Sequence, residues 1–111
     1  MKIDDLFEII EARAESDPEF SWTAKLLSQG PDKCAEKFGE EAIESIIAAT
    51  KKNKSELIHE TADLLYHLIV MLHANGVTLA EITDELERRK NISGIEAVSY
   101  THLRAHETRF Y

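Results

Sequence analysis

Five acidic side chains fall at helical spacing in two short stretches of the sequence. They are Glu40, Glu41, Glu44, Glu60 and Asp63. Residues three or four positions apart on a helix are surface neighbours, so Glu41 pairs with Glu44, and Glu60 pairs with Asp63. Like charges at this spacing destabilise a helix unless a cation neutralises them. The pattern therefore indicates a site for a divalent metal ion.

Carboxylate oxygens are the ligands that Mg²⁺ prefers, and this ion commonly joins protein carboxylates to substrate phosphates. We expect four metal ligands from two adjacent antiparallel helices, namely Glu41, Glu44, Glu60 and Asp63. Glu40 lies about 100° around the helix from Glu41, and it could bind the metal, hold a second ion or orient the attacking water. The predicted chemistry is hydrolysis of a phosphoanhydride by a metal-activated water.

Basic side chains are expected to hold the phosphates outside the metal sphere. Lys37 is the best candidate, because it precedes Glu40 and Glu41 by one helical turn. We therefore predict a catalytic set of Glu40, Glu41 and Lys37. Lys25 and Lys33 are the next candidates for binding the substrate.

Bulk composition narrows the class of protein. The net charge of −8 argues against binding to nucleic acid, whose phosphates attract basic surfaces. An acidic protein can still bind a nucleotide when a metal supplies the positive charge. No apolar run is as long as a membrane span, and the acidic N-terminus is unlike a signal peptide, so we expect a cytoplasmic protein with a small-molecule partner. The single cysteine, Cys34, lies on an apolar stripe and is predicted to pack in the core.

Hydrophobic periodicity predicts an all-α fold, an antiparallel bundle of four to five helices. The expected helices cover about residues 3–14, 21–27, 31–50 and 54–75, with a last helix that begins near residue 79. In the third helix the residues expected to face inward are Cys34, Phe38, Ala42, Ile43, Ile46 and Ile47. Gly39 costs this helix about 1 kcal/mol relative to Ala, which suggests the close approach of a neighbour or ligand. The fourth helix is apolar around most of its girth, which predicts a homodimer that buries it further.

The end of the chain differs from the rest. Residues 98–111 show no helical stripe and resemble translated sequencing-adapter read-through. We therefore expect one domain over residues 1–97 and a non-native tail over residues 98–111, which we exclude from functional reasoning.

Longer strings across the chain resemble phosphoribosyl-ATP pyrophosphohydrolase of histidine biosynthesis. The strings are Trp22-Thr23-Ala24-Lys25-Leu26-Leu27, Gly30-Pro31-Asp32-Lys33, Lys37-Phe38-Gly39-Glu40-Glu41-Ala42-Ile43-Glu44, Glu60-Thr61-Ala62-Asp63-Leu64-Leu65-Tyr66-His67-Leu68 and Glu85-Leu86-Glu87-Arg88-Arg89. The acidic pattern alone is shared by the wider MazG-like all-α pyrophosphatases. The strings at residues 23–26 and 63–67 select the histidine-pathway branch.

The resemblance implies hydrolysis of the α–β anhydride of phosphoribosyl-ATP to phosphoribosyl-AMP and pyrophosphate. It also implies Mg²⁺, a homodimer, and metal ligation by Glu41, Glu44, Glu60 and Asp63. Trp22 could then stack on the adenine or pack in the core. Tyr66 and His67 are expected to serve packing and the interface rather than catalysis.

Three alternatives stay open. A housecleaning nucleoside-triphosphate pyrophosphatase of the MazG type would use the same acidic residues. A di-iron bundle would use the Glu-x-x-His element at Glu56 and His59. A non-catalytic acidic helical dimer would only bind partners, and it leaves the acidic spacing unexplained.

Overall fold

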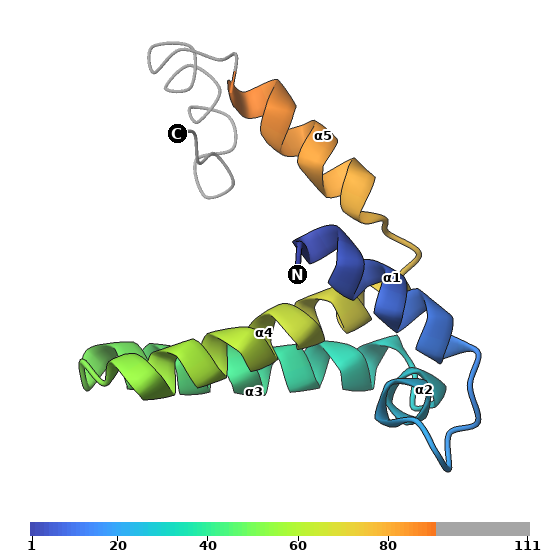
Figure 1. The fold of residues 1–111 in the computed structure, drawn as a ribbon, viewed down its shortest axis with the longest axis horizontal. Coiled ribbons are helices and arrows are strands. Elements are labelled where there is room, and N and C mark those ends of the chain that lie inside the picture. Colours follow the sequence, from blue (N-terminus) through green and yellow to red (C-terminus); the bar gives the residue numbers. More distant parts are fainter. Residues whose placement is uncertain (91–111) are drawn as a thin grey trace. The chain divides into compact units, whose positions relative to one another are not determined.

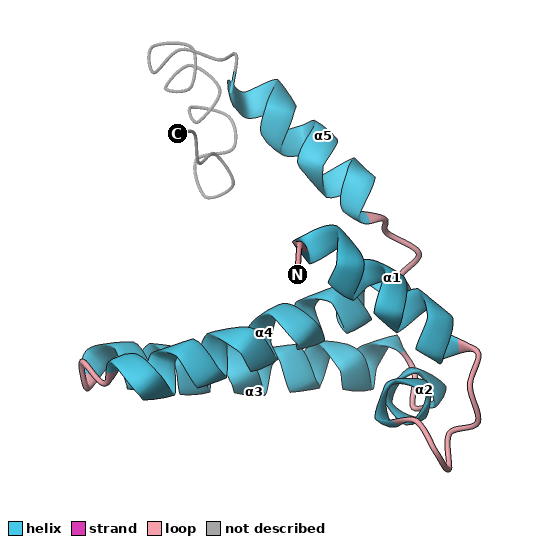
Figure 2. Ribbon diagram, viewed as in Figure 1, coloured by secondary structure: helices cyan, strands magenta, loops and turns pink. Residues whose placement is uncertain are grey.

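The computed structural model describes residues 1–90, which form five α-helices and no strand (Figures 1 and 2). The helices are α1 (Ile3–Ala14), α2 (Trp22–Ser28), α3 (Pro31–Thr50), α4 (Lys54–Ala74) and α5 (Leu79–Lys90). The prediction of an all-α fold is confirmed. The expected domain boundary at residues 97 and 98 lies outside the described residues.

Capping residues set where the central helices begin. The Asn53 side chain accepts a hydrogen bond from the Glu56 N–H at 3.1 Å, which caps α4. Ser21 caps α2 in the same way through the Ala24 N–H, also at 3.1 Å. Pro31 opens α3 at its first position, where its missing N–H leaves no hydrogen bond unmade.

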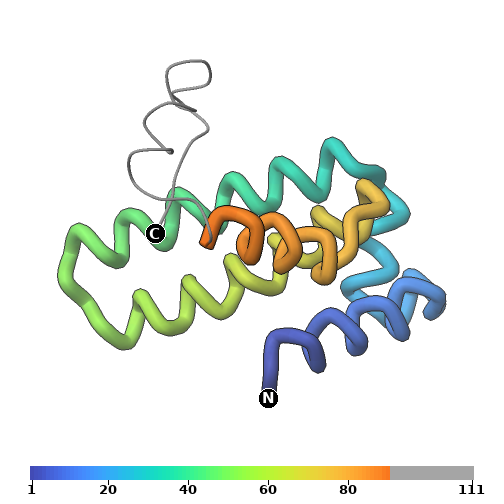
Figure 3. The backbone as a smooth tube through the Cα atoms, turned by 90° about the horizontal axis from the view of Figure 1, so that it is seen from above, coloured from blue at the N-terminus to red at the C-terminus, as the bar shows by residue number. Residues whose placement is uncertain are grey.

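The α3 and α4 helices form an antiparallel hairpin, and they run side by side for most of their length (Figures 1 and 3). At the end of the hairpin away from its turn, α1 and α2 pack against it. The buried core lies at this junction and consists of Ile10, Leu26, Cys34, Ile69 and Val70. Cys34 is 1% exposed, so its prediction as a core residue is confirmed.

The isoleucines of α3 do not face α4, contrary to expectation. Ile43, Ile46 and Ile47 are 60%, 61% and 46% exposed. The buried positions on this part of α3 are Ser45 and Ala48, whose small side chains let the two helices approach. The sequence carries apolar residues on two sides of α3, and periodicity alone does not say which side meets α4.

Gly39 has open space around it. A Cβ atom placed there would meet no atom within 4 Å in the part of the chain that the structure describes. The expected close approach of a neighbour is therefore not found within residues 1–90.

A second compact unit begins at Ala80 and contains nearly all of α5. Within α5, Glu85 accepts hydrogen bonds from Arg88 and Arg89, and these bonds lower the pKa of Glu85 to about 2. No single helix within residues 1–90 is long and apolar enough to cross a membrane.

Candidate metal and substrate site

The α3–α4 hairpin brings three of the five acidic residues together between its turn and the core. Glu41 and Glu44 come from α3 and Glu60 comes from α4. One carboxylate oxygen of each lies within 4.8 Å of the others. This spacing suits shared coordination of one cation by oxygen ligands.

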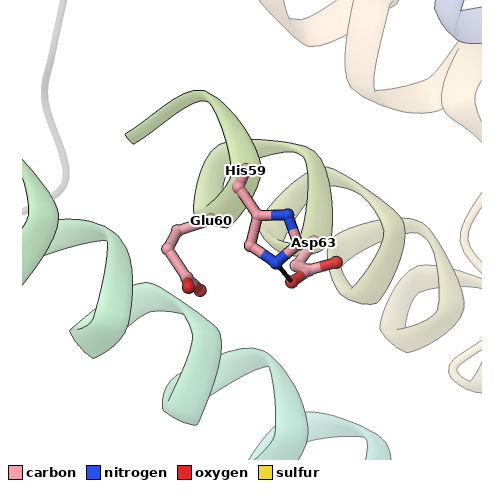
Figure 4. A group of neighbouring side chains, drawn as sticks. All are labelled: His59, Glu60 and Asp63. Atoms are coloured by element: carbon pink, nitrogen blue, oxygen red, sulfur yellow. Dashed lines mark ion pairs between the residues drawn. The ribbon is translucent and has the colours of Figure 1, made fainter. Parts of the chain in front are cut away.

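A second group on α4 shares Glu60 and adds Asp63 and His59 (Figure 4). The His59 Nε2 lies 3.5 Å from the Asp63 Oδ2, and the Glu60 side chain extends toward α3. Sequence reasoning did not place His59 in the site, although its spacing of four residues from Asp63 could have suggested it. Neither of the two groups found within residues 1–90 contains Glu56, the other residue of the di-iron alternative.

Two oxygens in this cluster are buried and lack a hydrogen-bond donor. They are Glu41 Oε2 and Glu60 Oε2, which have no partner within residues 1–90. Buried polar atoms in proteins are nearly always paired, so an unpaired carboxylate oxygen indicates a ligand or ion. Oxygens of this kind suit a hard divalent cation.

The electrostatics of the cluster agree with this geometry. Burial, followed by the neighbouring charge of Glu44, raises the pKa of Glu41 to about 7, and the charges of Asp63 and Glu60 add to the effect. A hydrogen bond with Glu44, followed by burial, raises the pKa of Glu60. Each of these two carboxylates is therefore easier to protonate than an ordinary glutamate unless a cation lies near it.

Glu40 stands apart from both groups and pairs with Lys37. The Lys37 Nζ lies 3.3 Å from a Glu40 carboxylate oxygen on the surface of α3. The pair brings Lys37, one turn from Glu41, beside the acidic cluster, and it accounts for Glu40 without a metal.

His67 and Tyr66 follow the acidic residues along α4. His67 is 8% exposed, and its Nδ1 has no hydrogen-bond partner within residues 1–90. Burial lowers the pKa of His67, while the Asp63 charge opposes that shift and Lys37 adds to it. The Tyr66 hydroxyl lies 2.6 Å from the Thr23 Oγ1, which joins α4 to α2.

The remaining predicted substrate residues lie away from the carboxylates. Lys33 pairs with Glu36 at 3.4 Å near the start of α3. Lys25 lies over the Trp22 ring, with its Nζ 5.9 Å from the ring centroid. Trp22 is 53% exposed, so it is not a core residue in this chain.

Taken together, the hairpin presents clustered oxygen ligands and a lysine one turn away. This arrangement could hold a cation against the phosphates of a nucleotide. The assignment of Glu41, Glu44, Glu60 and Asp63 as ligands stays a prediction, as does the substrate role of the lysines and Trp22.

Comparisons with known proteins agree on one family. The family model described as phosphoribosyl-ATP pyrophosphohydrolase matches residues 3–90. The chain is 62% identical over 91 residues to a phosphoribosyl-ATP pyrophosphatase of Paracoccus denitrificans. The aligned stretch covers 82% of this chain and 84% of that protein. A protein of the same name from Dinoroseobacter shibae is 63% identical over 86 residues, which is 78% of this chain and 84% of that protein. Another from Roseobacter denitrificans is 58% identical over 95 residues, which is 86% and 90% of the two chains.

Proposed function

Because the chain belongs to the phosphoribosyl-ATP pyrophosphohydrolase family, we propose that it hydrolyses phosphoribosyl-ATP in histidine biosynthesis. One water and one phosphoribosyl-ATP would give phosphoribosyl-AMP and pyrophosphate by cleavage of the α–β anhydride. The observation that carries this proposal is the meeting of carboxylates from α3 and α4 around unpaired buried oxygens. Because the substrate is a nucleotide of amino-acid biosynthesis, we propose that the enzyme acts in the cytoplasm.

Glu41, Glu44, Glu60 and Asp63 would hold a divalent cation, for which Mg²⁺ is our choice because its ligands are hard oxygens. Such an ion would supply positive charge against the developing charge of the phosphates and would acidify a bound water. The His59 imidazole, 3.5 Å from Asp63, would orient that carboxylate.

Lys37 would bind a phosphate of the substrate as a positive charge at the edge of the cluster. Glu40 holds the Lys37 ammonium at 3.3 Å and would position it for that contact. Glu40 would thus act through Lys37. Lys25 and Lys33 would contribute a further positive field near the substrate.

We also propose a homodimer. Near its turn, the hairpin exposes Ile43, Ile46 and Ile47 on α3, and Ile58 of α4 is 62% exposed. Contiguous exposed apolar side chains commonly mark an interface between proteins. A second copy that covers them would also shield the acidic cluster from water.

The proposal is tested with the purified full chain and phosphoribosyl-ATP. We expect one pyrophosphate per substrate, no free orthophosphate, dependence on Mg²⁺, and no product in the presence of EDTA. Absence of pyrophosphate release with either Mg²⁺ or Mn²⁺ present would contradict the proposed function.

The same assay separates this function from a housecleaning nucleoside-triphosphate pyrophosphatase. Common deoxynucleoside triphosphates are offered side by side with phosphoribosyl-ATP. We expect a large preference in kcat/KM for phosphoribosyl-ATP, whereas the housecleaning activity requires the reverse. A protein that hydrolyses neither while still dimerising would instead be a binding protein.

The functional domain is proposed to end at residue 97. A chain ending there should release pyrophosphate at the same rate as the full chain, because residues 98–111 lack the pattern of the family. A loss of activity on truncation would show that the end of the chain contributes to the site.

A further inference from the structure

A pocket of about 570 Å³ lies where the end of α1 and the start of α2 meet α4. Its walls include Arg13 of α1, Trp22 and Thr23 of α2, and Tyr66 of α4. A volume of this size falls in the range of pockets that hold small organic ligands. None of the proposed metal ligands lines this pocket.

The outer wall combines a cation with exposed aromatic rings. Arg13 is exposed, and no carboxylate within residues 1–90 lies at ion-pair distance from it. Phe20 is 86% exposed and Trp22 is 53% exposed. A free guanidinium binds a phosphate through two parallel hydrogen bonds, and an exposed aromatic ring stacks on a flat heterocycle. The wall therefore suits a ligand that carries both groups.

The inner wall is held in place by a buried contact. Thr23 is 3% exposed, and its Oγ1 lies 2.6 Å from the Tyr66 hydroxyl. The charge of Arg13 reaches this phenol, since it opposes the rise in the Tyr66 pKa that burial causes. Arg13 and Tyr66 both line the pocket.

The pocket adjoins the acidic cluster along α4. Tyr66 follows Asp63 by three residues, which places it one turn further along the helix, a rise of about 4.5 Å. A ligand with its polyphosphate at the carboxylates could therefore place its other end in the pocket. Such a ligand needs an anion at each end and a heterocycle between them.

We propose that this pocket binds the end of the substrate remote from the hydrolysed anhydride, with the purine against Trp22 and a terminal phosphate monoester on Arg13. This inference rests on the proposed function, because phosphoribosyl-ATP carries a sugar phosphate on its purine and ATP does not. The pocket would then be the place where the enzyme distinguishes the two nucleotides. Trp22 acquires the stacking role that the sequence left open.

The test compares Arg13→Gln with the wild-type chain. We expect the KM for phosphoribosyl-ATP to rise by about tenfold to a hundredfold, as expected from loss of a charge-assisted hydrogen bond, while kcat changes much less. Wild-type protein should be inhibited more strongly by phosphoribosyl-AMP than by AMP. In Arg13→Gln the two inhibitors should act alike, because only phosphoribosyl-AMP carries the terminal phosphate.

Two further variants control for charge and geometry. Arg13→Lys keeps the charge but loses the planar fork, so it should recover only part of the affinity. Lys51→Gln removes one positive charge at the α3–α4 turn, at the other end of the hairpin (Figure 1). Its KM should match that of the wild type.

The outcomes separate this inference from the proposed function. If the wild-type chain releases no pyrophosphate from phosphoribosyl-ATP, the proposed function fails. If the wild type is active and Arg13→Gln keeps both its KM and its preference for phosphoribosyl-AMP, the pocket assignment is wrong. An unchanged KM in Trp22→Leu together with a loss of the dimer would show that the pocket is covered by a second copy instead.

Discussion

At the scale of single residues, the main feature of the site is a cluster of carboxylates that have no lysine or arginine as an ion-pair partner in the described part of the chain. The carboxylates of Glu41, Glu44 and Glu60 converge, and no lysine or arginine within residues 1–90 forms an ion pair with them. The nearby Lys37 is instead paired with Glu40. A bound cation would therefore relieve repulsion as well as take part in the reaction.

Replacing a proposed ligand should remove activity and spare the fold. In Glu41→Gln we expect pyrophosphate release to fall by more than the roughly 10–100-fold that follows loss of an outer-shell partner of a metal. The helix should remain, because the change removes repulsion from Glu44. Steady-state rates and circular dichroism measure the two effects. Glu36→Gln, on the same helix but paired with Lys33, is the matched control, and equal losses in both variants would argue against ligation by Glu41.

The pair of Glu40 and Lys37 predicts coupled variants. Lys37→Gln should raise the KM, since it removes the charge that binds phosphate, and Glu40→Gln should raise it less, since it only frees the lysine. The double variant should resemble Lys37→Gln alone, because the residues act as a unit. If the effects of the two single changes on KM simply add in the double variant, Glu40 has a separate role, such as binding the metal.

The raised pKa of Glu41 predicts how stability depends on pH. Its value is about 7 in the folded protein against an ordinary 4.5, so between these pH values the folded state holds a proton that the unfolded state releases. The contribution of Glu41 to the free energy of unfolding of the metal-free protein should therefore fall as the pH rises from 4.5 to about 7, and then become level. Urea unfolding in EDTA measures it.

Two conditions should flatten this dependence. Glu44→Gln removes the main neighbouring charge from Glu41, and saturating Mg²⁺ neutralises the cluster. Glu85 does not interfere, because its pKa of about 2 against the ordinary 4.5 confines its effect on stability to lower pH. The lowered pKa of His67 acts in the opposite direction, so the comparison with Glu44→Gln isolates the carboxylates. The same pH dependence in the wild type and in Glu44→Gln would show that Glu44 does not affect the protonation of Glu41.

At the scale of elements, α3 carries different functions on its different sides. One side presents Glu41, Ser45 and Ala48 toward α4, and another leaves Ile43 and Ile46 exposed. The small buried residues bring the two helices close enough for their carboxylates to meet. The absence of large side chains at these buried positions of α3 thus helps to position the site.

Gly39 lies in the middle of this helix without a structural need for glycine. Its backbone is not in the left-handed region, and a Cβ would meet no atom within 4 Å in the described part of the chain. Gly39→Ala should therefore raise the free energy of unfolding by about 1 kcal/mol. Ala35→Gly, at an exposed position of the same helix, should lower it by a similar amount.

Chemical denaturation of both variants measures these changes. A Gly39→Ala variant that is less stable than the wild type would contradict the prediction. Gained stability with a raised KM would mean that the substrate approaches the helix backbone at this point.

At the scale of the whole molecule, the core and the acidic site occupy different parts of the hairpin. The buried cluster lies where α1 and α2 join α3 and α4, and the carboxylates lie nearer the turn. In that outer part the isoleucines of α3 are left to solvent in a single chain. A second copy would complete the environment that the carboxylates need.

A charged residue on this surface should separate the copies. Ile46 is 61% exposed, so Ile46→Glu should leave the single chain folded while placing a charge in the proposed interface. Light scattering after gel filtration should then give the mass of a monomer. As a control, Gln29→Glu adds the same charge at the end of α2 and should remain a dimer. If Ile46→Glu keeps the mass of a dimer, the interface lies on another surface.

Local signals in the sequence were enough for the helices and for much of the site. The apolar periods predicted helices over residues 31–50 and 54–75, and α3 and α4 begin there because Pro31 and the Asn53 cap act on neighbouring residues only. The spacing of Glu41 and Glu44 likewise predicted a shared face. The orientation of Ile46 could not be predicted, since it depends on which of two apolar sides of α3 meets α4.

The pocket beside α4 could not be predicted from the sequence either, because it depends on tertiary packing. Its walls come from Arg13, Trp22 and Tyr66, which are distant in the chain and meet only through tertiary packing. His59 was considered only with Glu56 as an alternative di-iron element, because its contact with Asp63 depends on side-chain conformation.

Cys34 offers a way to time the opening of the protein. It is the only cysteine of the chain, it is 1% exposed, and its Sγ lies 3.5 Å from the Leu26 carbonyl oxygen that accepts its hydrogen bond. Burial raises the pKa of its thiol, which makes it slow to react with alkylating reagents while the core is closed. The rate at which such a reagent labels native protein therefore reports how often the junction of α1, α2, α3 and α4 comes apart, with no engineered probe.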